Sequence, residues 1–228
     1  MKKIISVTLF AICGLSTISS EWSYKDQKDW HMQTGKMQSP INISTKVVKD
    51  AKVYSNLVLD YKNDIKEEIE NNGHSIEIVS KGKAVLNKRD FDLLAVHSHS
   101  PSEHTYDSKY YPLELHFVHK ATDGRLGVVG VMAQEGKENP EFQKMLDGIK
   151  PGHAEIDLNK MLPSEGTYYH YLGSLTTPPL TENVEWYLLK TPITLSKKQI
   201  EEYNRYYNGN NRELQELNDR PILIHNMK

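Results

Sequence analysis

Three histidines are the residues of this sequence whose chemistry is easiest to infer from their spacing. His97 and His99 are separated by one residue, and His116 lies in the segment Leu113–His119. Side chains alternate between the two faces of a β-strand, so His97 and His99 would point the same way, about 7 Å apart. A neighbouring strand could bring His116 to the same ion. Three imidazoles leave one position of tetrahedral zinc open, which is typical of catalytic rather than structural zinc.

An ordinary structural role is the alternative for these histidines. The chain contains 10 histidines, and a His-x-His pair can arise by chance, since most buried histidines are only hydrogen-bonded core residues. Two carboxylates favour the metal hypothesis. Glu103 lies between the pair and His116, and Glu114 lies two residues before His116 on the same strand face. A carboxylate behind a ligating imidazole fixes its tautomer and raises its basicity.

Short alternating runs of apolar and polar residues are typical of strands and dominate the chain. They are Leu57–Tyr61, Ser75–Val79, Leu113–His119, Gly127–Ala133 and Val184–Leu189. Turn signals such as Asn72-Gly73 and Asp123-Gly124 separate them. Helical patterns are limited to two segments, 139–146 and 196–203, the latter opening with a serine suited to a helix N-cap. The sequence therefore predicts a mainly β protein with a few short surface helices.

The N-terminal segment has the pattern of a secretory signal. Two lysines precede the apolar run Ile4–Ile12, and small residues follow it. We expect a signal peptide at residues 1–20, a single domain at residues 21–228, and export to the periplasm or the extracellular space. A membrane-spanning anchor is the alternative, but the run is shorter than the roughly 20 residues a span needs. The one cysteine, Cys13, falls inside this leader, where lipidation is a further alternative.

Charge excludes one large class of partner. The chain has 28 Lys and Arg against 30 Asp and Glu, a formal net charge of −2. No basic stripe interleaved with aromatic residues is present, so nucleic-acid binding is not expected. A near-neutral chain suits a small, diffusing substrate.

Five motifs, in order, give the chain a family resemblance. They are Gln38–Ile43, Asn71–Ser75, Ser100–Thr105, Tyr111–His119 and Gly173–Leu180. Together they resemble the signatures of the α-class carbonic anhydrases, zinc enzymes that hydrate carbon dioxide. The resemblance implies one large twisted, mostly antiparallel sheet of about ten strands, with zinc at the bottom of a conical cleft.

The resemblance also implies roles for individual residues. The zinc ligands would be His97, His99 and His116, with Glu114 behind the third. Thr176 would donate to Glu103 and orient the attacking oxygen, and His74 would be the proton shuttle. The substrate pocket would contain Val118, Val128, Leu175, Thr177 and Trp186. The polar residues of the cleft would be Tyr24, Asn72 and Glu77.

The implied reaction is the reversible hydration of carbon dioxide to bicarbonate and a proton. Zinc held by neutral imidazoles lowers the pKa of bound water to about 7, and the resulting hydroxide would attack carbon dioxide. Histidine titrates near neutral pH and so can carry the released proton to solvent. Sulfonamides and anions are the inhibitors that the resemblance implies, and the protein would be a monomer or a homodimer without a membrane span after signal cleavage.

Two of the departures from the family pattern bear directly on the predicted metal site. Ala95 stands where most members have a glutamine that accepts the ring N–H of the first zinc histidine. Loss of such a partner typically costs 10- to 100-fold in metal affinity or activity, so we expect weaker zinc retention, with His97 as the loosest ligand. Glu77 replaces a neutral amide, and we expect its charge to raise the pKa of His74.

Two other functions remain as alternatives. One is a carbonic-anhydrase-like binding module without turnover, although such relatives typically lack a zinc histidine and this chain has all three. The other is a zinc hydrolase acting on esters, for which the sequence shows no substrate-sized recognition motif.

Overall fold

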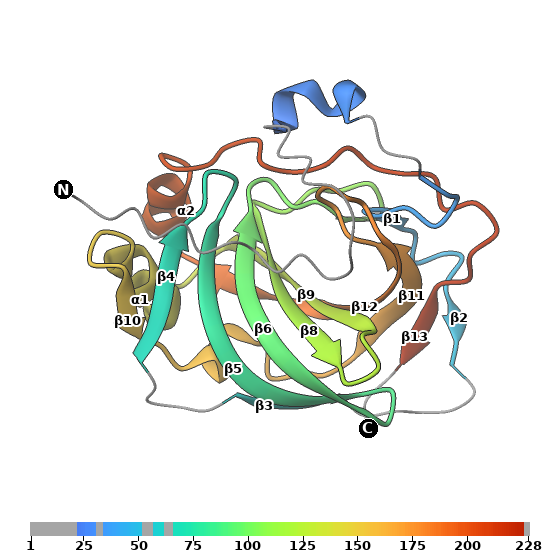
Figure 1. Ribbon diagram of the computed structural model, residues 1–228, viewed down its shortest axis with the longest axis horizontal. Helices are drawn as coiled ribbons and strands as arrows, with labels where there is room; N and C mark the ends of the chain where they lie inside the picture. The colour runs from blue at the N-terminus through green and yellow to red at the C-terminus, as the bar shows by residue number, and fades with distance from the viewer. Residues whose placement is uncertain (1–21, 31–33, 52–56, 62–65, 226–228) are drawn as a thin grey trace.

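Eleven strands form one strongly curved sheet that organises the chain (Figure 1). The computed structural model describes residues 22–30, 34–51, 57–61 and 66–225. The strand order is β10-β4-β5-β6-β8-β9-β12-β11-β13-β2, and β3 pairs with β5. Neighbouring strands are antiparallel except at two places, where β12 runs parallel to β9 and β13 runs parallel to β2. The expected large, mostly antiparallel sheet is therefore confirmed.

The elements have the following bounds. The long central strands are β4 (Lys66–Asn71), β5 (Ile76–Leu86), β6 (Arg89–His99), β8 (Leu113–Ala121), β9 (Leu126–Glu135), β11 (Tyr168–Ser174) and β12 (Glu182–Leu195). The shorter ones are β1 (Asn42–Ile43), β2 (Lys49–Asp50), β3 (Val58–Tyr61), β7 (Thr105–Tyr106), β10 (His153–Glu155) and β13 (Leu223–His225). The helices are α1 (Pro140–Gly148), α2 (Lys197–Tyr203), and the 3-10 turns η1 (Tyr24–Asp29) and η2 (Leu158–Met161).

Both helices start where a side chain caps the first turn. Asn139 accepts hydrogen bonds from the main-chain N–H groups of Glu141 and Phe142 and so begins α1. Ser196 begins α2 in a capping box with Gln199. The two helices contact each other at the end of the sheet that carries β4 and β10 (Figure 1). Both helical segments predicted from the sequence are confirmed.

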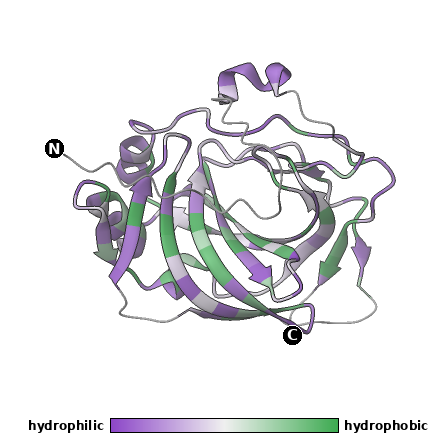
Figure 2. Cartoon of the chain, viewed as in Figure 1, coloured by the Kyte–Doolittle hydropathy of each residue, from purple (hydrophilic) through white to green (hydrophobic). Residues whose placement is uncertain are grey.

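The sheet separates two groups of apolar side chains. Alternation along β5 and β6 sends every second residue to each face, and Figure 2 shows the resulting bands of hydrophobic and hydrophilic residues. One group, with Phe117, Val129 and Tyr187, packs under α1 and α2. The other, with Val128 and Trp186, lies on the opposite face. That second face also carries the three histidines, so the candidate site lies beside an apolar wall.

A tight hairpin and one irregularity in the strand pairing set the register of the strand that holds two of the histidines. Asn87 and Lys88 both have positive φ angles, 48° and 63°, as a two-residue turn of a twisted hairpin requires. The turn joins β5 to β6, and a register shift between Val79 and Gly82 then places Glu77 directly opposite His97. The predicted signal peptide at residues 1–20 lies outside the described residues. Within the described ranges, no helix is both long enough and apolar enough to cross a membrane.

Candidate metal centre and its cleft

Strands β6 and β8 bring the three predicted ligands together. His97 and His99 share one face of β6, and His116 on β8 pairs directly with His97. The ring centroids are 5.0 Å apart for His97 and His99, 5.2 Å for His97 and His116, and 4.6 Å for His99 and His116. One nitrogen from each ring lies within 4.8 Å of the others. Metal binding by these rings stays a prediction, but the geometry that it needs is present.

The hydrogen bonds of the rings decide which nitrogens are free for a metal. His99 donates from Nδ1 to the main-chain oxygen of Asn210 at 2.7 Å, and its Nε2 is buried without a partner. His116 donates from Nε2 to Glu114 Oε1 at 2.9 Å, which leaves Nδ1. The structure shows no hydrogen bond to the His97 ring from any described residue. The donor set therefore fits zinc: three imidazole nitrogens converge, and two of the rings are fixed in the required tautomer.

Burial favours the neutral, ligating form of His97 and His99. Burial, with the neighbouring histidine rings, holds the pKa of His97 well below its usual value. The pKa of His99 is lowered by burial as well, partly offset by the nearby charge of Glu103. Neutral imidazole is the form that binds metal, so neither ring has to lose a proton at neutral pH.

Glu114 is the most heavily hydrogen-bonded carboxylate of the site. Oε2 accepts from the main-chain N–H groups of Glu103 and His104, each at 2.8 Å. Oε1 accepts from His104 Nδ1 at 2.8 Å and from His116 Nε2 at 2.9 Å. Burial alone would raise its pKa, but the two histidines hold it well below the usual range. Gly130 leaves room for this carboxylate, because a Cβ there would lie 3.3 Å from Oε1.

His104 extends the support of Glu114 into the core. Its Nε2 accepts from the Tyr171 hydroxyl at 2.7 Å, and Tyr171 in turn contacts Ser39 Oγ at 2.7 Å. His104 is fully buried. Its role in the structure is to hold Glu114. A second possible metal group, His104 with Glu114 and His116, is this hydrogen-bonded support rather than another site.

Glu103 lies against the free ligand nitrogens. Its Oε1 accepts from the main-chain N–H of Arg212 at 2.7 Å, while Oε2 is buried and has no hydrogen-bond partner among the described residues. Oε2 is 3.7 Å from His99 Nε2 and 4.0 Å from His116 Nδ1. Thr176 is buried, with 5% of its surface exposed. The hydrogen bond expected from Thr176 to Glu103 is not among the contacts of the described residues.

His74 lies in the turn before β5, as its sequence position predicts. The side chain of Asn72 accepts from the main-chain N–H of His74 at 3.0 Å and so shapes this turn. Trp22 stacks on the His74 ring, with centroids 3.7 Å apart and planes inclined by 9°. Burial lowers the pKa of His74. The expectation that Glu77 would raise this pKa is wrong, because burial of the ring lowers it.

An apolar wall runs beside the histidines, as expected. Ala95, Val118, Val128 and Trp186 are cross-strand neighbours in one row over β6, β8, β9 and β12. Trp186 is fixed by donation from Nε1 to the main-chain oxygen of Ser174 at 3.0 Å. The next row on the same face of the sheet contains His97 and His116.

The remaining pocket and cleft residues lie on the loop after β11 and near the N-terminus. Leu175 and Thr177 follow β11 and are half-buried. Tyr24 approaches His99 edge-on, with centroids 6.4 Å apart, and burial raises the pKa of its hydroxyl far above the usual value. The described residues thus include every site residue predicted from the sequence.

Asn210 is a supporting residue for which no role was predicted from the sequence. Its side-chain nitrogen donates to the main-chain oxygens of His74 and Ser98, both at 3.0 Å. Its side-chain oxygen accepts from the main-chain N–H of Ser100 at 2.8 Å. With its main-chain oxygen on His99, Asn210 joins the ligand strand to the turn of His74. The only signal in the sequence was the run Asn210-Asn211-Arg212, which resembles a segment of the family.

Comparison with known proteins identifies the family. The sequence model of the eukaryotic-type carbonic anhydrases matches residues 19–226. This chain belongs to that family. A carbonic anhydrase of Pectobacterium carotovorum is 36% identical over 249 residues, covering 99% of this chain and 100% of the relative. By this membership the chain is an enzyme of the carbonic anhydrase type.

Solved structures of the carbonic anhydrase family agree with the fold. The α-carbonic anhydrase of Thermovibrio ammonificans, in complex with the inhibitor sulfanilamide, is 40% identical and has a TM-score of 0.78, covering 83% of this chain and 87% of that one. A carbonic anhydrase of Chlamydomonas reinhardtii, in complex with acetazolamide, is 30% identical and has a TM-score of 0.82, covering 92% of this chain and 100% of that one.

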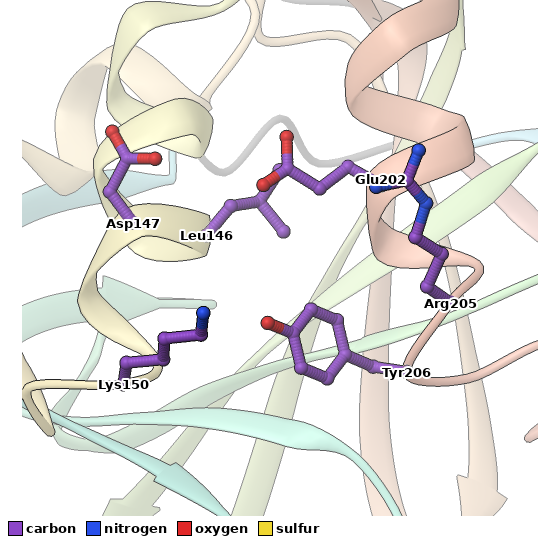
Figure 3. A pocket seen from close by; sticks show the side chains of 6 residues that line it. All are labelled: Leu146, Asp147, Lys150, Glu202, Arg205 and Tyr206. Carbon is purple, nitrogen blue, oxygen red and sulfur yellow. The ribbon is translucent and has the colours of Figure 1, made fainter.

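A separate hollow lies between α1 and α2, away from the histidines (Figure 3). Its volume is about 360 Å³. Lys150 and Tyr206 point toward each other across it in Figure 3, and Asp147, Glu202 and Arg205 complete its charged rim. It shares no residue with the metal centre, and its charges are balanced, so it gives no indication of a second active site.

Proposed function

We propose that this protein is a zinc-dependent enzyme that interconverts carbon dioxide and bicarbonate. One observation supports the proposal most strongly. Three imidazoles converge with nitrogens within 4.8 Å, while Asn210 and Glu114 occupy the opposite nitrogens of His99 and His116. A metal held in this way keeps a position open for chemistry. When bound there, zinc supplies the Lewis acidity that makes hydroxide available near neutral pH.

The supporting residues determine how well the ligands hold the metal. Glu114 and the main-chain oxygen of Asn210 fix the tautomers of His116 and His99, so that each ring turns a lone pair toward the centre. Because Glu114 is itself held by four hydrogen bonds, the third ligand has little freedom to turn. The ring of His97 has no such partner, so it remains the ligand expected to be loosest.

The apolar wall would bind the substrate. Carbon dioxide carries no charge and needs no ionic anchor, so Val118, Val128 and Leu175 can exclude water and place it beside the metal centre. Trp186 extends this wall beside Val128, with its indole N–H already satisfied by the main-chain oxygen of Ser174. Thr177 offers a hydroxyl at the edge of the pocket, where the product bicarbonate could be bound.

Thr176 and Glu103 would orient the attacking oxygen. Glu103 Oε2 is buried and unpartnered, so it can accept the hydroxyl proton of Thr176. The threonine oxygen then has only lone pairs left to offer and accepts a hydrogen bond from the nucleophile, aiming it at the carbon of the substrate.

His74 would carry the released proton to solvent. Its burial under Trp22 lowers its pKa, so the ring is mostly neutral at pH 7 and can accept a proton. Its turn is shaped by Asn72 and tied to Asn210. We propose that the His74 ring releases the proton when it turns away from Trp22 toward the solvent.

Export of the protein is part of the same proposal. The basic and apolar N-terminal segment supports it, and the family match begins only at residue 19. Mass spectrometry of the protein isolated from its native cells would test it. A mature N-terminus near residue 21 is expected, and an N-terminus at Met1 would contradict it.

A pair of variants on one strand tests the catalytic proposal. His116→Ala should lose stoichiometric zinc and the acceleration of carbon dioxide hydration. His119→Gln is the matched control, because His119 lies on the opposite face of β8, in contact with the Tyr61 hydroxyl. It should retain both. Zinc bound at full stoichiometry by the native chain without faster hydration would favour a binding module, and ester hydrolysis alone would favour a hydrolase.

A further inference from the structure

One row of the sheet places acidic side chains next to the zinc ligands. Glu77 on β5 pairs directly with His97 on β6, and His97 pairs directly with His116 on β8. On the other side, Glu77 pairs directly with Glu70 on β4. Directly opposite residues in a sheet project from the same face. The carboxylate of Glu77 therefore emerges on the face that holds the metal centre, one strand from the nearest ligand.

No described cation neutralises this carboxylate. Glu77 is half-buried, and it takes part in no ion pair within the described ranges. Its closest charged neighbour in the row is Glu70, which adds charge of the same sign. Adjacent strands are about 4.8 Å apart, which places the carboxylate on the order of 8 Å from an ion held by the three histidines. At that distance, and with part of the solvent excluded, the carboxylate still changes the binding free energy of the ion appreciably.

We propose that Glu77 sets the affinity of the metal centre for ions of both signs. Its negative charge strengthens the retention of zinc and weakens the binding of anions, bicarbonate included. The inference rests on the proposed function for the identity of the metal and of the product. It also identifies what this chain has in place of a neutral support for His97: Ala95 provides no acceptor, and Glu77 provides long-range attraction for the ion instead.

The two effects have opposite signs, and this separates charge from structural damage. A variant that merely loosens the site should lower the affinity for zinc and for anions together. Removal of the charge should lower zinc affinity and raise anion affinity. For one charge at roughly 8 Å and an effective dielectric constant of about 30 to 80, the affinity for a monovalent anion should change about two- to tenfold, and the affinity for divalent zinc by about the square of that factor. High salt should reduce both.

Glu77→Gln is the test variant, and Glu77→Asp retains the charge. Zinc affinity is measured by competition with a chelator. Azide affinity is measured by calorimetry on zinc-saturated protein at about pH 6.5, where water rather than hydroxide is the main competitor for the ion. Glu77→Gln should bind zinc more weakly and azide more tightly, and Glu77→Asp should remain close to the native protein. Glu70→Gln, one strand further from the histidines, should show smaller changes in the same directions.

Two outcomes would overturn the inference. One is that Glu77→Gln leaves both affinities unchanged. The other is that it weakens both together, as a structural role would. Neither measurement depends on turnover, so the inference and the proposed function can fail separately. If zinc and azide respond as expected but hydration is not accelerated, the proposed reaction fails and the role of Glu77 stands.

Discussion

Replacement of Glu114 by glutamine tests how much the support behind His116 contributes. Glu114 accepts four hydrogen bonds from buried donors, two at each oxygen. In glutamine one of these oxygens becomes an NH₂ group, which cannot accept. Whichever oxygen is lost, two buried N–H groups are left without an acceptor. Each costs about 1–3 kcal/mol, so we expect Glu114→Gln to lower the free energy of unfolding by about 4 kcal/mol.

The same substitution should loosen the metal. His116 would lose the charged acceptor that fixes its ring, and the loss of such a partner typically lowers metal affinity by about 10- to 100-fold. Urea unfolding of the metal-free protein measures the first effect, and competition with a chelator measures the second.

Glu141 offers a matched control for this experiment. It is another buried glutamate, with 4% of its surface exposed, and it accepts from the main-chain N–H of Asp157 and from Lys144, away from the metal centre. Glu141→Gln should cost stability but leave zinc affinity unchanged. Native zinc affinity in Glu114→Gln, or a loss of stability below about 1 kcal/mol, would refute the reasoning.

Four further predictions follow from individual contacts. Ala95→Gln should slow zinc dissociation about tenfold or more by giving His97 an acceptor, whereas Ala95→Met, of similar size, should not; chelator competition distinguishes them. Asn210→Asp should lower the free energy of urea unfolding by about 2–3 kcal/mol, because two main-chain carbonyls lose their donor; native stability would contradict this. His74→Ala should slow hydration in weak buffer and be rescued by added imidazole; equal slowing in strong imidazole would count against a shuttle. Burial lowers the pKa of His119 to about 4. Between about pH 6.5 and pH 4 the imidazole is therefore protonated in the unfolded chain but neutral in the folded chain. The free energy of unfolding falls as the pH drops through this range. At pH 4.5 this group should cost about 2–3 kcal/mol, and His119→Gln should flatten that part of the unfolding profile.

Patterns that span only a few residues predicted which side chains share a strand face and where a helix begins. Alternation placed His97 and His99 on one face because a strand has a period of two residues. Ser196 marked the start of the second helix because its side chain satisfies an N–H group of the first turn. The family motifs added the identity of the third ligand and of the cleft residues.

The supporting contacts could not be predicted in the same way. Asn210 lies 111 residues from His99, whose ring it holds, and Tyr171 lies 67 residues from His104. These contacts depend on which loops the sheet brings together, and no periodicity carries that information. The lowered pKa of His74 is another case. It depends on the stack with Trp22, and the order of residues alone suggested only the charge of Glu77.

The rate of carbon dioxide hydration, measured by stopped flow before and after removal of the metal, tests the central claim most directly. The native chain should accelerate hydration strongly. A chelator that strips the metal should abolish the acceleration, and one equivalent of zinc should restore it. A chain that binds one zinc at the three histidines yet hydrates carbon dioxide no faster than buffer would contradict the account.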